Sequence, residues 1–345
     1  MRSFKALPSL LLPWYESHAR SLPWRENRDP YRVWVSEIML QQTRVEAVIG
    51  YYARFLEAFP TVDSLADADE DRLLKLWEGL GYYSRARNLQ KAAQKIVAEH
   101  GGVFPRDYRS IRALPGVGDY TAGAIASICF DQPHAAVDGN VLRVSARYLD
   151  DDTPIDEPPF KKAVTENLEK IYPAGACGTF TQSLMELGAT VCTPRSPKCA
   201  VCPLAAQCLA NKHGTAASLP VKNPKKDKKL VRKTVFLLWC GDELALCRRE
   251  ESGLLGGMWE LPNVDTPLDA DGALRQAEFF GARPKQMLSR VNRVHIFTHI
   301  RWEMAGYTIL CAEKAPQFTW RTREQIEKAY GLPTAFRKFL EEDIR

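Results

Sequence analysis

The stretch Leu114-Pro115-Gly116-Val117-Gly118 is the most informative about the architecture of this chain. It lies between two segments that we expect to be helical. Two glycines one residue apart allow the backbone to turn tightly and to expose its N–H groups. At the start of the following helix these N–H groups form a well for an anion. The stretch therefore predicts a helix–hairpin–helix over residues 112–122, a device that holds a nucleic-acid phosphate without reading sequence.

Helical periodicity surrounds this hairpin. Apolar residues recur at the i, i+3, i+4, i+7 spacing of one helix face, and glycine and proline separate such segments. We therefore expect residues 1–219 to form one all-α domain. The pattern is seen at Val45, Val48, Ile49, Tyr52 and Phe55, at Leu73, Leu74, Trp77 and Leu80, and at Ile125 and Ile128 beside Ala122 and Ala126.

The chain changes character after residue 219. Residues 220–233 hold seven lysines and arginines against the single acid Asp227, with two prolines. This composition predicts a solvated basic linker, which is either a simple tether or also a contact to DNA phosphates.

From residue 234 onward the apolar period becomes two. A turn at Gly241-Asp242 separates two strand-like runs and predicts a hairpin. Residues 234–345 therefore form a second domain of mixed α and β structure. Its expected strands are 234–240, 243–248, 297–304 and 307–311, and its expected helices are 324–330 and 334–342.

Composition sets wide limits on function. The 345 residues are enough for two domains, and the net charge of +5 permits a nucleic-acid partner without requiring one. No apolar run approaches the roughly 20 residues needed to cross a bilayer. Pro8 and Pro13 interrupt the apolar stretch near the N-terminus, which does not resemble a signal peptide. We expect a cytoplasmic, monomeric protein with no membrane partner.

Four of the nine cysteines are clustered, as Cys192-x6-Cys199-x2-Cys202-x5-Cys208. Four thiolates this close in sequence can surround one metal centre, and both zinc and an iron–sulfur cluster accept four thiolates. Spacing alone leaves both open. The other five cysteines are scattered among apolar neighbours, which indicates reduced, buried thiols.

Two acidic residues stand in unusual settings. Glu37 follows Trp34 by three residues and directly precedes Ile38. If it is not simply a surface or capping residue, a carboxyl desolvated there has a raised pKa and holds a proton near neutral pH, as a general acid requires. Asp138 lies twenty residues past Gly118 and, as an aspartate before glycine, would ordinarily be a turn or N-cap residue.

These motifs, in this order, resemble the helix–hairpin–helix glycosylase superfamily that includes endonuclease III. The run Val35-Ser36-Glu37-Ile38-Met39-Leu40-Gln41-Gln42-Thr43 is similar to the MutY-type adenine glycosylases within it. So are GLGYYSRARNL at 79–89 and VDGNV at 137–141. The resemblance covers essentially the whole chain. It implies that the four cysteines hold a [4Fe–4S] cluster. Arg195 and Lys198 lie between the first two cysteines, and a pinned loop would present them to phosphates, so we expect a structural, DNA-positioning role.

The resemblance also implies a reaction. The enzyme would remove adenine opposite 8-oxoguanine or guanine in double-stranded DNA. Glu37 would protonate a ring nitrogen of adenine, and an ionised Asp138 would stabilise the positive sugar or capture it covalently. Tyr120 and Asn140 resemble residues that orient these carboxyls. Strand-cleaving relatives carry a Schiff-base lysine where Tyr120 stands, so we expect a monofunctional glycosylase.

A further set of residues resembles the family's contacts to extruded bases and DNA. Gln42, with its neighbour Thr43, and Tyr82 would insert into the base stack, although Tyr82 could instead be a core residue. Gly116 and Gly118 would hold a phosphate. Residues expected to line the adenine pocket and contact the opposite base are Arg20, Leu22, Trp24, Arg25 and Gln182.

The second domain resembles the Nudix-like C-terminal domain of the same family, beginning with GLLGGMWELP at 253–262. The following segment, 271–280, lacks the carboxylate-rich box of a magnesium-dependent Nudix hydrolase, so we expect recognition and not hydrolysis. Phe297-Thr298-His299 matches the family's Phe-Ser-His loop that probes 8-oxoguanine, with threonine for serine. The alternative is an ordinary strand segment.

Two rival functions remain. One is an endonuclease III-type enzyme for damaged pyrimidines, against which stand Tyr120, Gln41-Gln42 and the second domain. The other is a non-catalytic iron–sulfur DNA-binding or redox protein, against which stand Glu37 and Asp138.

Overall fold

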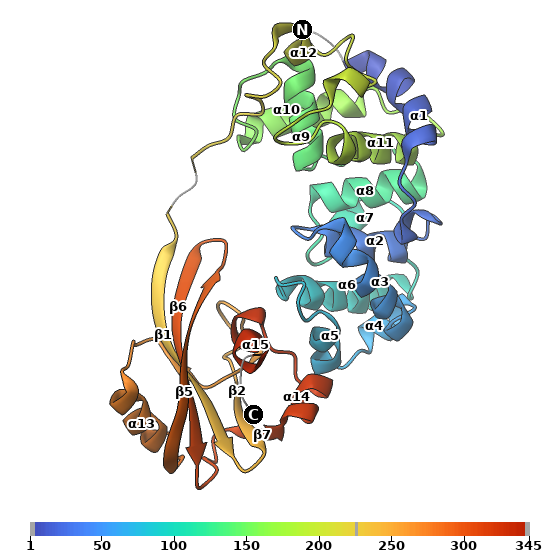
Figure 1. The fold of residues 1–345 in the computed structure, drawn as a ribbon. Coiled ribbons are helices and arrows are strands. Elements are labelled where there is room, and N and C mark those ends of the chain that lie inside the picture. The colour runs from blue at the N-terminus through green and yellow to red at the C-terminus, as the bar shows by residue number, and fades with distance from the viewer. Residues whose placement is uncertain (1–3, 225–226, 342–345) are drawn as a thin grey trace. The chain divides into compact units, whose positions relative to one another are not determined.

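The computed structural model describes residues 4–224 and 227–341. Lys225 and Lys226 of the predicted linker lie outside the described residues, as do residues 342–345. The chain divides into two compact units (Figure 1). The first comprises Met1–Asp67 and Asn88–Pro224, and the second comprises Ala68–Arg87 and Lys225–Arg345. No helix among the described residues is both long and apolar enough to cross a membrane.

The first unit is entirely helical, as the sequence predicts. Its α-helices are α1 (Leu7–His18), α2 (Pro30–Leu40), α3 (Val45–Ala58), α4 (Val62–Ala66), α6 (Ser84–His100, whose first turn belongs to the second unit), α7 (Tyr108–Arg112), α8 (Asp119–Phe130), α9 (Gly139–Leu149), α10 (Pro158–Glu169), α11 (Cys177–Thr190) and α12 (Leu209–His213). Short 3-10 turns lie at Phe4–Ala6, Pro23–Arg25 and Cys199–Val201.

Helix α11 is central to this unit, because it packs against α1, α8 and α9. Two glycines permit the close approach. A Cβ at Gly178 would lie 2.8 Å from the Ile128 Cα, and one at Gly188 would lie 2.5 Å from the Asn140 Cβ. Leu11, Val141, Phe180 and Leu187 fill the core between these helices. The start of α9 is thereby held close to α11.

The predicted helix–hairpin–helix is confirmed between α7 and α8. Gly116 has a φ of +74°, which favours glycine, and a Cβ there would lie 2.6 Å from the Asn88 Cβ. Gly118 is the N-cap of α8, and the space around its Cα is open. Arg112 supports the turn from within, because its Nη1 donates to the Val117 carbonyl at 2.9 Å.

The second unit is built on a mixed seven-stranded sheet in the order β3-β2-β1-β6-β5, with β4 paired to β1 and β7 to β2. β1 and β6 run parallel, and β5 and β6 form a long antiparallel hairpin. The elements are α5 (Glu70–Leu76), β1 (Lys229–Cys240), β2 (Glu243–Arg248), β3 (Trp259–Glu260), β4 (Asn263–Val264), α13 (Ala270–Phe279), β5 (Pro284–Ile296), β6 (Ile300–Cys311), β7 (Thr319–Thr322), α14 (Arg323–Ala329) and α15 (Thr334–Glu341).

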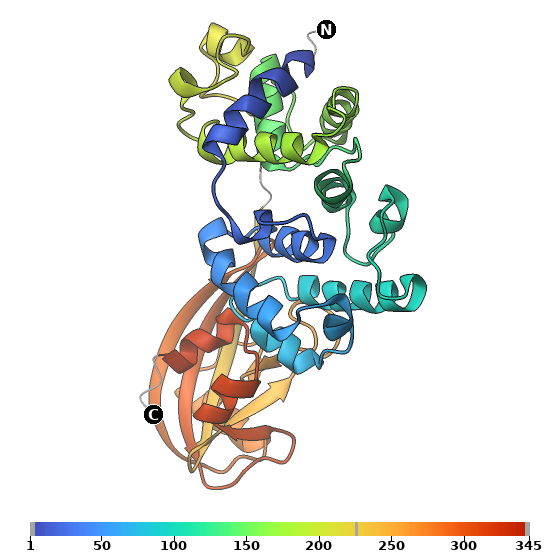
Figure 2. The ribbon, with the colours of Figure 1, turned by 90° about the vertical axis from the view of Figure 1, so that its right-hand side faces the viewer.

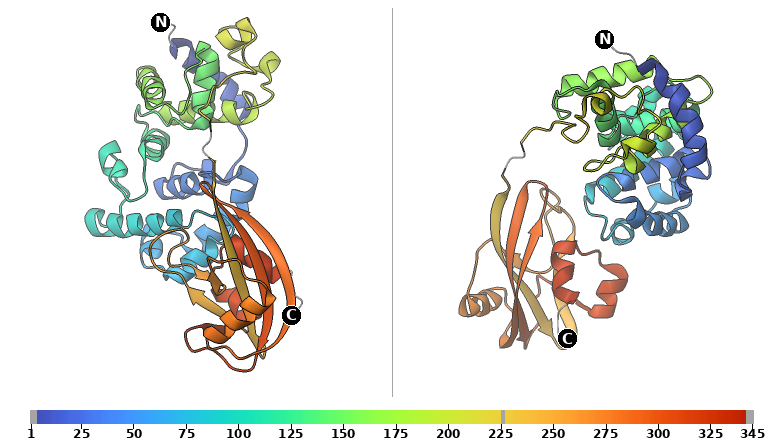
Figure 3. Two further views of the ribbon diagram at one scale, coloured as in Figure 1. Left: turned by 90° about the vertical axis from the view of Figure 1, so that its left-hand side faces the viewer. Right: turned by 45° about the horizontal axis from the view of Figure 1, so that its top comes forward.

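Helices cover both faces of this sheet. Figure 3 (right) shows α13 on one side and the helices α14 and α15 on the other, and Figure 2 shows the latter pair in front of the strands. Ala273 and Ala277 of α13 pack against Phe236 of β1. On the opposite face Phe336 and Phe339 of α15 form a second core. Alternate residues of β1 therefore point into different cores.

The second unit corrects several sequence predictions. β1 begins at Lys229, inside the predicted linker. The predicted strands 297–304 and 307–311 are one strand, β6, which begins only at Ile300. β5 was not predicted because its apolar residues do not alternate regularly. A register shift lies between Met287 and Ser289, and Val291 and Val294 lie on opposite faces. The predicted helix around Leu73 ends at Leu76 as α5.

Helix α5 and the loop after it were expected in the first domain but belong to the second unit. Lys75 Nζ donates to the Tyr330 carbonyl at 3.3 Å, and Glu78 accepts from the Leu332 N–H at 2.9 Å. Arg87 donates to the Gly256 carbonyl at 2.6 Å.

Candidate active site

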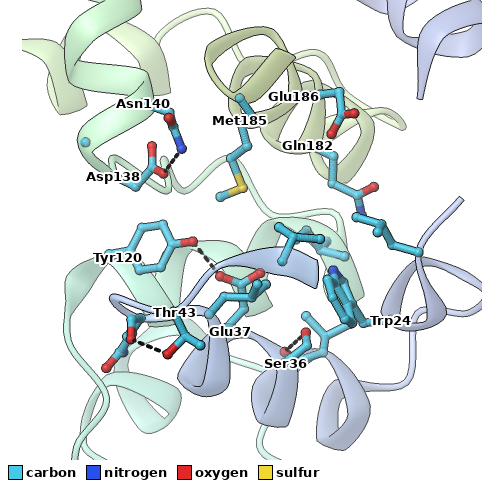
Figure 4. Close-up of a pocket in the computed structure, with 18 of the residues that line it drawn as sticks. Trp24, Ser36, Glu37, Thr43, Tyr120, Asp138, Asn140, Gln182, Met185 and Glu186 are labelled. Carbon is cyan, nitrogen blue, oxygen red and sulfur yellow. Dashed lines mark hydrogen bonds between the residues drawn. The ribbon is translucent and has the colours of Figure 1, made fainter. Parts of the chain in front are cut away.

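One pocket of about 630 Å³ in the first unit is lined by α2, α8, α9, α11 and the segment before α2 (Figure 4). It gathers eleven residues that the sequence singled out: Arg20, Leu22, Trp24, Arg25, Glu37, Gln42, Thr43, Tyr120, Asp138, Asn140 and Gln182. The other DNA-contact residues predicted in the first unit, Gly116 and Gly118, lie in the hairpin. The two carboxyls are thus brought together from α2 and from the start of α9.

Glu37 lies on α2, which begins after the N-cap Asp29 with Pro30 in its first turn. Its side chain is only 6% exposed, and Tyr120 Oη donates a hydrogen bond to its Oε2 at 2.5 Å. Burial raises the pKa of Glu37 to about 7, outweighing the Tyr120 hydrogen bond, which favours the carboxylate. A substantial fraction of Glu37 is therefore protonated at neutral pH.

Asp138 is the N-cap of α9, and its Oδ1 accepts the Val141 N–H at 2.8 Å. Its Oδ2 accepts the Asn140 amide at 2.8 Å. Burial raises the pKa of Asp138, while both hydrogen bonds oppose that rise because they favour the carboxylate. The ordinary N-cap role and a place in the pocket are therefore combined in one residue. Figure 4 shows the Tyr120 ring beneath Asp138, with its hydroxyl turned toward Glu37.

Asn140 is itself held by the body of the unit. Arg143 Nη2 donates to Asn140 Oδ1 at 2.8 Å and to the Gly188 carbonyl at 2.7 Å. The same guanidinium donates through Nε to the Cys192 carbonyl at 2.7 Å. A continuous set of hydrogen bonds therefore connects Asp138 to the first cysteine of the predicted metal loop.

A second glutamate, Glu186, lines the pocket and was missed from the sequence. It is fully buried, and its carboxylate binds Arg20 Nε at 2.6 Å and Arg25 Nη2 at 2.8 Å. The two guanidinium groups lower the pKa of Glu186 despite the opposing effect of burial, which is the largest single influence. The sequence did offer a signal: Glu186 is a lone acid between Met185 and Leu187, and it follows Gln182 by four residues, which places both on one helix face.

The apolar part of the pocket holds the residues expected around a base. Leu22 and Trp24 are 6% and 7% exposed, and the Trp24 ring meets Tyr52 edge-on at 5.5 Å between centroids. Gln182 lies opposite on α11, and its Oε1 accepts a hydrogen bond from Tyr15 Oη at 2.5 Å. The pocket therefore offers an aromatic wall together with an amide and two guanidinium groups.

The two residues expected to insert into DNA share a backbone property. Gln42, in the first unit, has a φ of +59°, and Tyr82, in the second, has a φ of +47°. Such values are uncommon outside glycine and are held at functional loops. Gln42 is exposed and Tyr82 is 45% exposed, so the core alternative for Tyr82 does not hold. Thr43 follows Gln42, and its hydroxyl donates to the Gln41 carbonyl at 3.4 Å.

Phe297, Thr298 and His299 form the turn between β5 and β6 in the second unit, so the alternative of an ordinary strand segment is not what the structure has. The Phe297 ring packs on Trp302 at 4.8 Å, and its carbonyl accepts from Lys228 Nζ at 2.6 Å. Thr298 and His299 are exposed. The Thr298 hydroxyl is hydrogen-bonded to Tyr82 Oη at 2.8 Å, which joins two predicted DNA contacts within this unit.

The four clustered cysteines, Cys192, Cys199, Cys202 and Cys208, line one cavity of about 30 Å³. Among the described residues, no three His, Cys, Asp or Glu side chains lie close enough together to bind a single metal ion. Arg147 donates to Cys192 Sγ at 3.3 Å and to the Thr193 carbonyl at 2.7 Å, which braces the loop. Four sulfur donors with an N–H donor to one of them fit a thiolate-held cluster.

Comparison with protein families agrees with this arrangement. Residues 35–173 match the HhH-GPD superfamily base excision DNA repair protein family, and residues 234–342 match the NUDIX domain. Residues 192–208 match the iron-sulfur binding domain of endonuclease III, so the cysteines hold an iron–sulfur cluster and not zinc. The chain is therefore a DNA N-glycosylase with a helix–hairpin–helix domain and a Nudix-like domain.

Sequence relatives identify the family of glycosylases to which the chain belongs. An adenine DNA glycosylase of Rattus norvegicus is 35% identical, with 95% of this chain and 76% of the relative covered. One from Buchnera aphidicola subsp. Baizongia pistaciae is 40% identical, covering 87% and 82%. The chain belongs to the adenine DNA glycosylase family.

Solved structures agree for the helical part. A thermostable thymine-DNA glycosylase has a TM-score of 0.56 and 30% identity, over 61% of this chain and 96% of its own. An endonuclease III–DNA complex has a TM-score of 0.52 and 26% identity, over 62% and 99%.

Proposed function

We propose that this enzyme hydrolyses the N-glycosidic bond of adenine paired with 8-oxoguanine or guanine in double-stranded DNA. The observation that carries the proposal is the pair of carboxyls in one pocket, with Glu37 able to hold a proton at neutral pH. The related adenine DNA glycosylases support adenine as the released base, and protonation by Glu37 supports its departure.

Adenine is a poor leaving group as an anion. Protonated Glu37 transfers its proton to a ring nitrogen, and the bonding pair of the C1′–N9 bond moves to the base as that bond breaks. Asp138, as the carboxylate, stabilises the positive charge that develops on the deoxyribose or captures it covalently. Water then adds its oxygen to C1′, which breaks the Asp138–C1′ bond where one has formed, and the proton that the water loses returns to the Glu37 carboxylate. The products are neutral adenine and an abasic site.

The hydrogen bonds of the pocket divide these roles between the carboxyls. The Val141 N–H and the Asn140 amide both donate to Asp138 and favour its charged form. Glu37 receives only the Tyr120 hydroxyl among the described residues, and burial keeps its pKa near 7. We therefore assign Glu37 as the acid, Asp138 as the charge-stabilising residue, and Tyr120 and Asn140 as the residues that orient them.

Binding to DNA would use both units. The open hairpin around Gly116 and Gly118 would hold a phosphate, and Gln42 with Thr43 would replace the extruded base. In the second unit Tyr82 would also insert into the base stack, and the Phe297-Thr298-His299 turn would contact the opposite base. We propose that the cluster is [4Fe–4S] and fixes a loop that carries Arg195 and Lys198 toward phosphates.

The proposal is tested with duplexes that contain adenine opposite 8-oxoguanine, with and without alkali. Full-length enzyme should give strand breaks only after alkali, because Tyr120 provides no amine to cleave the abasic site. No product after alkali would contradict the proposed function. Efficient trapping of a covalent imine by borohydride would contradict the monofunctional assignment alone.

The lesion-reading turn has its own test. Phe297→Ala with His299→Ala should reduce the preference for 8-oxoguanine over guanine about tenfold, since lost base contacts are worth about 1–3 kcal/mol. Excision opposite guanine serves as the control for the chemical step. An unchanged preference would contradict the assignment of this turn.

A further inference from the structure

The hydroxyl of Tyr15 is bonded to the Gln182 amide, although Tyr15 is not part of the pocket lining. Tyr15 lies on α1 and is 8% exposed, and Gln182 lies 167 positions later on α11. The donor–acceptor distance from Tyr15 Oη to Gln182 Oε1 is 2.5 Å, which makes this a short and well-formed hydrogen bond. The bond connects two helices that pack directly on each other.

Gln182 stands between two cavities. It lines the main pocket of about 630 Å³ and also a neighbouring cavity of about 400 Å³. Of these two cavities Tyr15 lines only the smaller one, so it contacts the Gln182 amide from the side away from the main pocket. Arg25 covers the Tyr15 ring, with its guanidinium carbon 5.6 Å from the ring centroid, and Glu186 binds that same guanidinium. The tyrosine is thus held in place by the pocket's own ion pairs.

We propose that Tyr15 is a positioning residue for base selectivity. Its hydroxyl engages the carbonyl oxygen of Gln182 and leaves the NH2 group to face the extruded purine. An unanchored glutamine could present either end of its amide, because the two ends have nearly the same shape. The inference rests on the proposed function and deepens it by naming what selects the base.

A fixed NH2 group distinguishes two purines of almost equal size. Adenine has an unprotonated acceptor nitrogen at position 1, whereas hypoxanthine has an N–H there and a carbonyl at position 6. A donor that faces an acceptor gains a hydrogen bond, but a donor that faces an N–H leaves both groups unpaired in a buried site. Sites built on such hydrogen bonds discriminate far better than apolar ones. Arg20 and Arg25 add further donors to the same wall.

The experiment uses the full-length cluster-containing enzyme in single-turnover excision of adenine and of hypoxanthine, each opposite 8-oxoguanine. Tyr15→Phe should slow adenine release several-fold and lower the adenine-to-hypoxanthine rate ratio about tenfold, the effect of one misdirected hydrogen bond. If hypoxanthine release is too slow to detect, the slower release of adenine alone still tests the role of Tyr15. In a Gln182→Met background, Tyr15→Phe should change neither quantity further.

The matched control is Tyr172→Phe. Tyr172 is also a tyrosine bonded to α11, through the adjacent residue Thr181 at 2.9 Å, but neither residue lines the pocket. This variant should keep the wild-type ratio. An unchanged rate and ratio in Tyr15→Phe, with an active wild type, would overturn the role of Tyr15. An equal effect in the Gln182→Met background would also overturn it. A wild type that releases no adenine would instead overturn the proposed function.

Discussion

Two buried glutamates in the same pocket respond to burial in opposite ways. Glu37 is 6% exposed and its pKa rises to about 7, while Glu186 is 0% exposed and its pKa falls. Their partners account for the difference. Glu37 accepts a hydrogen bond from a neutral phenol, whereas Glu186 binds the guanidinium groups of Arg20 and Arg25. Burial therefore raises the pKa of the carboxyl that hydrogen-bonds a neutral phenol, and it is outweighed where two guanidinium groups bind the carboxyl directly.

The contrast divides the pocket into a reactive part and a recognition part. A permanently charged glutamate cannot donate a proton, but it can hold two arginines at fixed positions. A glutamate that titrates near neutrality can act as a general acid, but it binds neighbouring side chains less strongly than a fully charged one does. Glutamate thus has two roles here: Glu37 on α2 would donate a proton, and Glu186 on α11 positions two arginines.

The largest effect is expected from removing the proton of Glu37. Glu37→Gln keeps the shape of the side chain but cannot donate a proton to adenine, so single-turnover excision should fall by about 10²–10⁴, the usual contribution of general acid catalysis. Glu186→Gln is the matched control, because it makes the same change in the same pocket, and it should lose only about tenfold. Similar losses in the two variants would contradict the division of roles.

A second test uses pH, since the pKa of Glu37 lies near neutrality. Excision requires protonated Glu37, so the rate should be lost as pH rises through about 7, tenfold per pH unit. On the acidic side the rate should fall where Asp138 becomes protonated, which occurs above its ordinary pKa because burial raises it. Rates across a pH series give both limbs.

Tyr120→Phe sharpens the pH test. Its hydroxyl lowers the pKa of Glu37, so removing it should shift the alkaline limb to higher pH. An alkaline limb that stays fixed in this variant would show that Glu37 is not the group that titrates.

Local sequence patterns were enough for much of this arrangement. The Gly116–Gly118 turn, the Gly241-Asp242 hairpin and the cysteine spacing depend on neighbouring residues, and the structure has all three. The eleven pocket residues were named because their motifs resemble a family, and the structure places them together. Their roles stay predictions.

What the sequence did not reveal depends on contacts far apart in the chain. Tyr15 is informative only once α1 packs on α11, and Glu186 only once two arginines approach it. β5 has apolar residues on both faces and therefore no clear period. The segment 68–87 is helical by pattern, but its packing against α14 is a property of the folded unit.

The smallest effect concerns stability, where the two glutamates should differ in sign. Because the pKa of Glu37 is about 7 when folded and 4.5 when unfolded, the folded state loses stability as pH rises from 4.5 to 7. Glu37→Gln should therefore raise the free energy of unfolding by about 3 kcal/mol above pH 7, from 1.36 kcal/mol per pKa unit, and change little below pH 4. Glu186→Gln should lower it by about 2 kcal/mol at neutral pH, because two partly buried arginines lose their anion. Denaturant unfolding at pH 4 and pH 8 measures both, and destabilisation by Glu37→Gln at pH 8 would mean that the carboxyl is paired with a cation after all.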